Sequence, residues 1–110
     1  MNIKTLIDLL LYCKRVFEAI SSDERLTMAH LCIYNAILQC WNENDFSNPV
    51  KITRREIMRL SKVKSKTTYH KCIRDLQAFG YINYEPSFKP QGSSVYILTY
   101  EPKNMLLCLP

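Results

Sequence analysis

Apolar residues recur at three- and four-residue intervals through the first part of the chain, which is typical of amphipathic helices. The first run predicts a helix over residues 3–20, and the polar stretch SSDE ends it. A second run predicts a helix from near Thr27 to about Trp41, with two apolar stripes side by side. A helix that is so widely apolar is expected in the buried centre of the fold.

A short strand and a third helix are predicted next. The segment VKI at 50–52 is alternating and short, as an edge strand would be. Thr53 and Glu56 have the spacing of a capping box, which predicts a helix that ends near Ser61. The segment KVK at 62–64 is the expected turn.

The pattern then changes from helix to strand. Ser65 can cap a helix through Phe79, and Gly80 stands where helices commonly end in the left-handed conformation. After Gly80 the apolar period falls from about 3.6 to 2. This predicts a β-hairpin with strands at 81–85 and 94–100 and a long tip between them.

The order of these elements indicates the fold class. Two helices joined by a short turn and followed by a hairpin are typical of a winged helix-turn-helix. We therefore expect one α+β, mainly α domain over residues 1–110. It would contain an N-terminal amphipathic helix (1–20), a winged-helix core (27–100) and a tail (101–110).

Positive charge is concentrated in one part of the chain. Residues 1–45 carry four basic and six acidic side chains, a balance of −2, whereas residues 46–110 carry eleven basic and four acidic ones, a balance of +7. Within 51–74, nine basic residues stand against Glu56 alone. Charge gathered on one third of a small domain suggests an anionic partner.

The helix expected after Ser65 has one apolar and one basic face. At about 100° per residue, the inward positions are Tyr69, Cys72, Ile73, Leu76 and Phe79. The outward positions are Thr67, His70, Lys71, Arg74 and Ala78, and Asp75 lies on the shoulder between the faces. Such a face is either a solvated surface or a surface that enters the major groove of DNA, where arginine and lysine donate to guanine.

The candidate DNA-binding residues extend around this helix. Those of the preceding helix and turn, which would cross the DNA backbone, are Arg54, Arg55, Lys62 and Lys64. Those at the partially positive N-terminus, where a phosphate is favoured, are Ser65, Lys66 and Thr67. The outward face adds His70, Lys71 and Arg74, and the hairpin tip adds Lys89. His70 is either a DNA contact or a solvated side chain.

Residues 26–98, and above all SKTTYHKCIRDLQAFGYI, resemble a winged-helix family of plasmids and integrated mobile elements in Bacteroides-type bacteria. Members of that family are described as transcriptional regulators. The resemblance implies sequence-specific binding of double-stranded DNA and a role in regulating or replicating mobile DNA. It assigns no base-contacting residue, and it does not cover the first helix or the tail.

Other functional classes find little support in the sequence. The five cysteines lack C-x-x-C spacing, so buried free thiols in a reducing cytosol are expected rather than a zinc site or disulfides. His30 is expected to be structural and partly buried. No paired carboxylates, nucleophile motif or metal-ligand cluster can be assembled, so we expect no enzyme, no cofactor and no small-molecule substrate. Asp8 interrupts the N-terminal apolar run, Lys14 and Arg15 close it, and no small-residue cleavage site follows. We therefore expect neither a signal peptide nor a membrane span, and a cytoplasmic protein.

Two questions about partners stay open at this level. The same fold can serve as a protein-interaction module, for example as an accessory in replication or mobilisation. A homodimer is also expected, because one helix reads only a few base pairs and a two-fold protein matches a palindromic site. Helix 3–20 is the predicted interface, because Leu9, Leu11 and Tyr12 are apolar residues that lie off its main stripe. Residues 104–109 are a further candidate part of this interface.

Overall fold

The computed structural model describes residues 2–97, apart from the side chains of residues 5, 9, 12, 13 and 16. Its elements are α1 (Ile3–Ser22), α2 (Met28–Glu43), β1 (Val50–Ile52), α3 (Arg54–Ser61), α4 (Lys66–Ala78), β2 (Ile82–Glu85) and β3 (Ser93–Ile97). The expected α+β, mainly helical class and the expected order of elements are confirmed. The predicted strand end at 98–100 and the tail at 101–110 lie outside the described residues.

The three strands form one antiparallel sheet in the order β1–β3–β2. The hairpin strands β2 and β3 are neighbours, and β1 joins the other side of β3, with Val50 opposite Val95. The side chain of Asn48 extends this pairing, because its amide donates to the carbonyl of Ile97 and accepts from the amide of the same residue. β1 is thus the edge strand that its length and pattern predict.

The helix ends follow the predicted capping residues. Thr27 and Ser65 accept hydrogen bonds from the first turns of α2 and α4. Thr53 Oγ1 accepts from the amide of Glu56 at 3.2 Å, but the Glu56 carboxylate lies 3.7 Å from Arg59, so only the threonine half of the predicted capping box is found. Within the described residues, a capping box with both of its hydrogen bonds is found at the start of α2, between Thr27 and His30.

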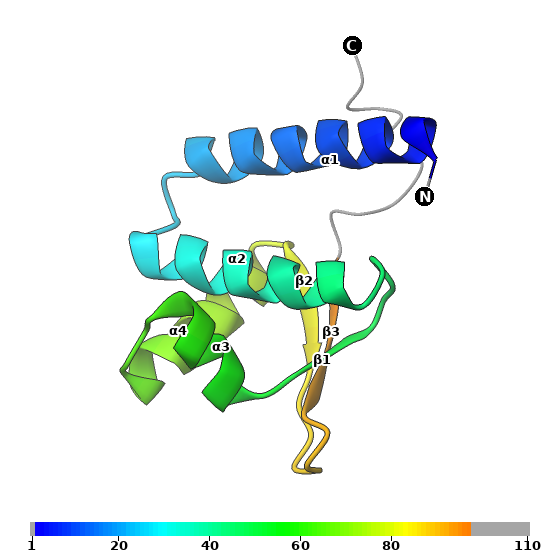
Figure 1. Ribbon diagram of the computed structural model, residues 1–110. Coiled ribbons are helices and arrows are strands. Elements are labelled where there is room, and N and C mark those ends of the chain that lie inside the picture. The colour runs from blue at the N-terminus through cyan, green and yellow to red at the C-terminus, as the bar shows by residue number, and fades with distance from the viewer. Residues whose placement is uncertain (1, 98–110) are drawn as a thin grey trace.

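The core forms around α2, which lies between α1 on one side and α3, α4 and the sheet on the other (Figure 1). The largest fully buried side chains are Trp41, Tyr34, Tyr69, Ile33, Ile37, Ile57, Leu76, Ile82, Ile97, His30 and Val95. They come from α2, α3, α4, β2 and β3. The sequence expectation that α2 is the buried centre is confirmed.

The described cysteines are part of this packing. Cys40 and Cys72 are buried, Cys32 is half-buried, and all three are free thiols. Burial raises the pKa of the Cys40 and Cys72 thiols, which keeps them protonated and poorly nucleophilic. These three cysteines therefore act as small apolar residues.

Among the described side chains of the first helix, Ile20 is the one that joins the core. Ile20 is buried, whereas Ile3, Leu6, Ile7, Leu10 and Phe17 are between 49% and 76% exposed. Among the described residues, no helix is both long enough and apolar enough to cross a bilayer.

Candidate nucleic-acid interface

The turn between α3 and α4 is shaped by its own side chains. Lys62 adopts the left-handed conformation (φ 63°) and ends α3. Ser61 Oγ then accepts from the amide of Val63 at 3.3 Å, and Ser65 Oγ accepts from the amide of Thr68 at 3.2 Å. The bond from Thr68 satisfies an amide that the start of α4 leaves without a partner, and the bond from Val63 holds the turn. The predicted turn at 62–64 is confirmed, and it sets the angle between the two helices.

The orientation of α4 agrees with the wheel derived from its sequence. Tyr69, Cys72, Ile73 and Leu76 are buried, and Phe79 is half-buried at the C-cap. The outward positions Thr67, His70, Lys71, Arg74 and Ala78 are all exposed. The basic face is therefore directed away from the core, and no other described segment of the chain covers it.

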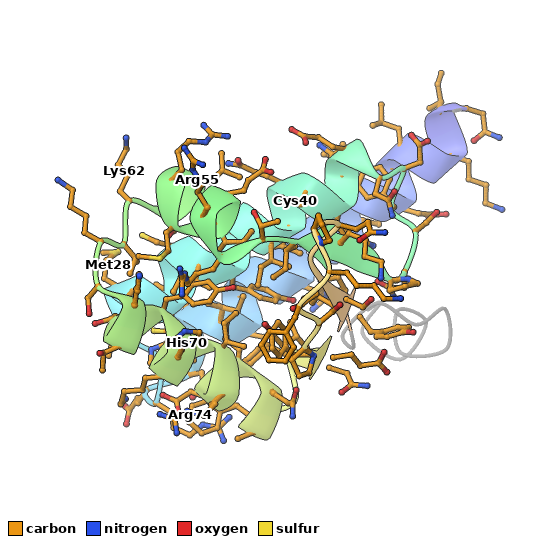
Figure 2. The ribbon with its side chains drawn as sticks, turned by 90° about the horizontal axis from the view of Figure 1, so that it is seen from below. Met28, Cys40, Arg55, Lys62, His70 and Arg74 are labelled. Atoms are coloured by element: carbon orange, nitrogen blue, oxygen red, sulfur yellow. The ribbon has the colours of Figure 1, made fainter. Side chains whose placement is uncertain are left out.

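The candidate residues form a surface that bends around α3 and α4. All eleven are exposed: Arg54, Arg55, Lys62, Lys64, Ser65, Lys66, Thr67, His70, Lys71, Arg74 and Lys89. In Figure 2, Arg55 and Lys62 lie along one edge of the molecule and Arg74 along the opposite edge, with His70 between them. Lys89 is apart from this group, because it sits at the tip of the β2–β3 hairpin, which projects beyond the helices (Figure 1).

Two cations of this region are paired, which the sequence interpretation did not include. Lys71 Nζ lies 3.2 Å from Asp75 Oδ2, and Arg59 lies 3.7 Å from Glu56. Lys71 is thus not the free cation that the wheel suggested. In residues 2–97, by contrast, no carboxylate pairs with the cations Arg54, Arg55, Lys62, Lys64, Lys66 and Arg74. We call these six residues the basic surface.

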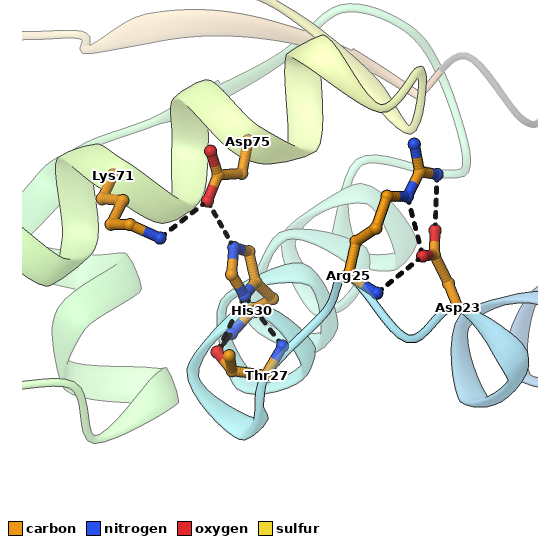
Figure 3. A network of polar contacts seen from close by, with 6 residues as sticks. All are labelled: Asp23, Arg25, Thr27, His30, Lys71 and Asp75. Atoms are coloured by element: carbon orange, nitrogen blue, oxygen red, sulfur yellow. Dashed lines mark hydrogen bonds and ion pairs between the residues drawn. The ribbon is translucent and has the colours of Figure 1, made fainter.

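Asp75 connects the outward face of α4 to the start of α2 (Figure 3). Its Oδ2 atom accepts from His30 Nε2 at 2.8 Å as well as from Lys71. His30 Nδ1 accepts from the backbone amide of Thr27 at 2.9 Å, so the ring is a neutral tautomer with its proton on Nε2. The hydrogen bond from His30, and then that from Lys71, lower the pKa of the Asp75 carboxyl.

This contact makes the position of α4 depend on a residue 45 positions away in the sequence. His30 is 2% exposed, less than the partial burial that the sequence suggested. The Lys71–Asp75 pair was detectable from its four-residue spacing on a helix. The His30 contact was not, because nothing in the local pattern of α2 indicates which residue of α4 it faces.

A second polar cluster holds the loop before α2 against the end of α4. The Arg25 guanidinium donates to Asp23, lies 4.1 Å over the ring of Phe79, and is partly exposed. The Tyr81 hydroxyl donates to Asp23 Oδ2 at 2.7 Å. The hydrogen bond from Arg25 and that from Tyr81 hold the pKa of Asp23 well below its usual range. Burial, and then the bond to Asp23, raise the pKa of Tyr81 to about 12.

The structure offers one more feature near these elements, a cleft of about 220 Å³ between the end of α1 and α2. Its lining is mostly apolar, with Phe17, Ile20, Leu31 and Leu38 among its residues. Within residues 2–97, no three histidine, cysteine or acidic side chains gather as metal ligands would.

Comparison with known proteins gives no match to a family model, to a curated protein or to a solved structure.

Proposed function

We propose that the chain is a sequence-specific double-stranded DNA-binding protein, with α3 and α4 as a helix-turn-helix and the β2–β3 hairpin as its wing. The observation that carries the proposal is the basic surface. Its six cations lack acidic partners among the described residues. They lie on two consecutive helices and the turn between them, and the other sides of these helices are buried. A solvated helix face ordinarily mixes both signs of charge.

The elements have distinct roles in this proposal. α4 enters the major groove, where Arg74 can donate to guanine O6 and N7 and Thr67 can contact a thymine methyl. The N-terminus of α4 and the cations of α3 and the turn contact phosphates. Lys89 contacts a phosphate or the minor groove beside the main site. The resemblance found in the sequence supports a role in regulating transcription on mobile DNA, in the cytoplasm.

Salt dependence tests the proposal directly. Fragments selected from genomic DNA would be titrated by fluorescence anisotropy at several salt concentrations. If five or six phosphates are contacted, the logarithm of affinity falls against the logarithm of salt with a slope of about −5. A slope near zero would contradict the proposal.

Variants separate base contacts from phosphate contacts. Arg74→Ala is expected to cost about 1–3 kcal/mol on the selected fragment and much less on unrelated DNA. Lys64→Ala is expected to weaken binding to both and to make the slope shallower by about 1. Arg15→Ala on α1 is the matched control, since it removes one charge outside the basic surface. If Arg15→Ala weakens DNA binding as much as Arg74→Ala and Lys64→Ala do, the assignment of the basic surface is wrong.

A second function has an observation of its own. The apolar side chains exposed along α1 favour a protein-interaction module, for example an accessory in replication or mobilisation. Binding to a hydrophobic protein partner would depend weakly on salt. It would also survive Lys64→Ala and fail when the apolar residues of α1 are changed.

A further inference from the structure

Five exposed apolar residues of α1 share one face of the helix, which the exposed Lys14 interrupts between Leu10 and Phe17. On a wheel of about 100° per residue, Ile3, Leu6, Ile7, Leu10 and Phe17 fall within an arc of about 100°. Their exposed fractions run from 49% to 76%, and Leu11, beside the arc, is 38% exposed. Scattered exposed leucines are ordinary, but five large apolar side chains on one face over about four turns of a helix are the pattern of an interface.

The stripe begins at the cleft and runs away from it. Phe17 and Ile20 line the cleft together with residues of α2, and Ile20 is buried there. Toward the N-terminus the same face continues through Leu10, Leu6 and Ile3, where exposure reaches 76%. α1 therefore presents an apolar face that borders α2 near Phe17, and the described side chains of this face are exposed toward the N-terminus.

From this face and its charges we propose that α1 pairs with α1 of a second copy of the chain in an antiparallel, two-fold arrangement. A two-fold interface places the same surface on both protomers, so one stripe covers the other without further partners. The proposal does not depend on DNA binding.

The charges beside the stripe select the antiparallel direction. Lys4, Leu11 and Glu18 are spaced by seven residues and lie along one flank of α1. In an antiparallel pair centred on Leu11, Lys4 of one protomer lies opposite Glu18 of its partner, and the reciprocal pair forms at the other end. Glu18 also lies 3.9 Å from Lys14 of its own helix, so the contact with Lys4 would add a second cation to this carboxylate. In a parallel pair this flank would face the opposite flank of the partner helix, so Lys4 and Glu18 would not meet and neither pair would form.

The size of the stripe sets the expected affinity. The stripe runs over residues 3–17, about 20 Å of helix, so the paired stripes are expected to bury an area at or below the low end of specific interfaces. A dimer that dissociates in the micromolar range is expected.

Sedimentation equilibrium of the full chain without DNA, from about 5 to 200 μM, tests the pairing. The wild type should shift from monomer to dimer over this range. The double variant Leu6→Glu/Leu10→Glu should stay monomeric while its urea unfolding midpoint is unchanged, because both side chains are exposed in the monomer. A wild type that is monomeric at 200 μM overturns the proposal, and dimerisation only after removal of residues 103–110 would show that the tail covers α1 instead.

Charge reversal tests the direction of the pair. Lys4→Glu and Glu18→Lys should each weaken dimerisation by about fivefold or more, because each places like charges opposite each other at both ends. The combined variant Lys4→Glu/Glu18→Lys should restore the wild-type constant. A combined variant no better than the single ones overturns the antiparallel arrangement. Anisotropy with a short duplex, measured on the same proteins, separates this outcome from a failure of DNA binding.

Discussion

At Asp75 a single carboxylate oxygen serves the fold and the candidate interface together. Asp75 Oδ2 accepts from buried His30 at 2.8 Å and from exposed Lys71 at 3.2 Å. The first contact fixes α4 against α2, because a buried histidine cannot reorient without losing its hydrogen bonds. The second contact holds one cation of the outward face at the protein surface. Asp75 is therefore a positioning residue that also restrains a candidate DNA contact.

Asp75→Asn should separate these two roles. The amide oxygen can still accept from His30, so the cost in stability should be about 1 kcal/mol. Lys71 loses its charged partner, so affinity for duplex DNA should rise about two- to fivefold at low salt. The slope of log affinity against log salt should become steeper by about 1. Anisotropy titration at several salt concentrations measures both quantities.

The control for this variant is Asp45→Asn, which makes the same change in net charge in the exposed loop after α2. It should have a much smaller effect on affinity. Equal effects of the two variants would mean that Lys71 does not contact DNA.

Acid should weaken the fold through Asp23 and Asp75. Hydrogen bonds from Arg25 and from His30 are the main causes that lower the pKa values of these two carboxyls. In the unfolded chain the carboxyls take up protons near pH 4, whereas in the folded chain they do so at lower pH. Their stabilisation is thus complete above that range and is lost as pH falls through the folded pKa values.

Urea unfolding between pH 7 and pH 3 measures this loss of stability, which should be smaller in the double variant Asp23→Asn/Asp75→Asn. If the free energy of unfolding falls equally with pH in the wild type and in the double variant, other carboxyls are responsible for the loss.

At the scale of elements, the turn between α3 and α4 depends on one residue in a strained conformation. Lys62 has φ 63°, a region that residues with a Cβ adopt at a cost of about 1–2 kcal/mol and that glycine adopts freely. Lys62→Gly should therefore be as stable as the wild type or more stable, although it removes a cation of the basic surface. Its DNA affinity should fall and its salt slope should become shallower by about 1.

Lys62→Ala removes the same charge and keeps the strained conformation, so it provides the comparison. Both variants should lose the same DNA affinity. Alanine should leave the urea midpoint close to that of the wild type, whereas glycine should match or raise it. A difference in DNA affinity between them would indicate that the conformation of the turn, and not the charge of Lys62, controls binding.

The two glycines are expected to differ in how much stability is lost when alanine replaces them. Both have positive φ, 88° at Gly80 and 98° at Gly92. A Cβ at Gly80 meets nothing within 4 Å, so Gly80→Ala should cost about 1 kcal/mol for the backbone conformation alone. At Gly92 a Cβ would overlap the carbonyl oxygen of Ile52 in β1, and Gly92→Ala should cost about 2–4 kcal/mol. Urea unfolding of both variants checks this order, and equal costs would contradict the close contact between β1 and the hairpin.

Most elements were predictable because their signals are local. Thr27, Ser65 and Gly80 mark helix ends through contacts within four residues of themselves, and these ends agree with the structure within about two residues. The outward face of α4 was predictable for the same reason, since a helical period is a local property. The pairing of β1 with β3 was less accessible, because its partners are more than forty residues apart and register is set by tertiary packing.

At the scale of the whole molecule, charge and apolar surface are found on different helices. The basic surface lies on α3, α4 and their turn, whereas the exposed apolar stripe lies on α1. α2 lies between them and is buried on the side that faces α3 and α4 (Figure 1). A DNA contact and a protein contact can therefore form at the same time without competing for the same residues.

Within the described residues, the sequence by itself determined the order and approximate bounds of the helices and strands, which face of α4 points outward, and where positive charge is concentrated. These properties depend on periodicity, capping and composition, which act within a few residues. Only the tertiary structure decided that Asp75 holds His30 and restrains Lys71, and that α1 is left with an exposed apolar face. Both outcomes depend on which surfaces meet after the chain has packed, and no local pattern carries that information.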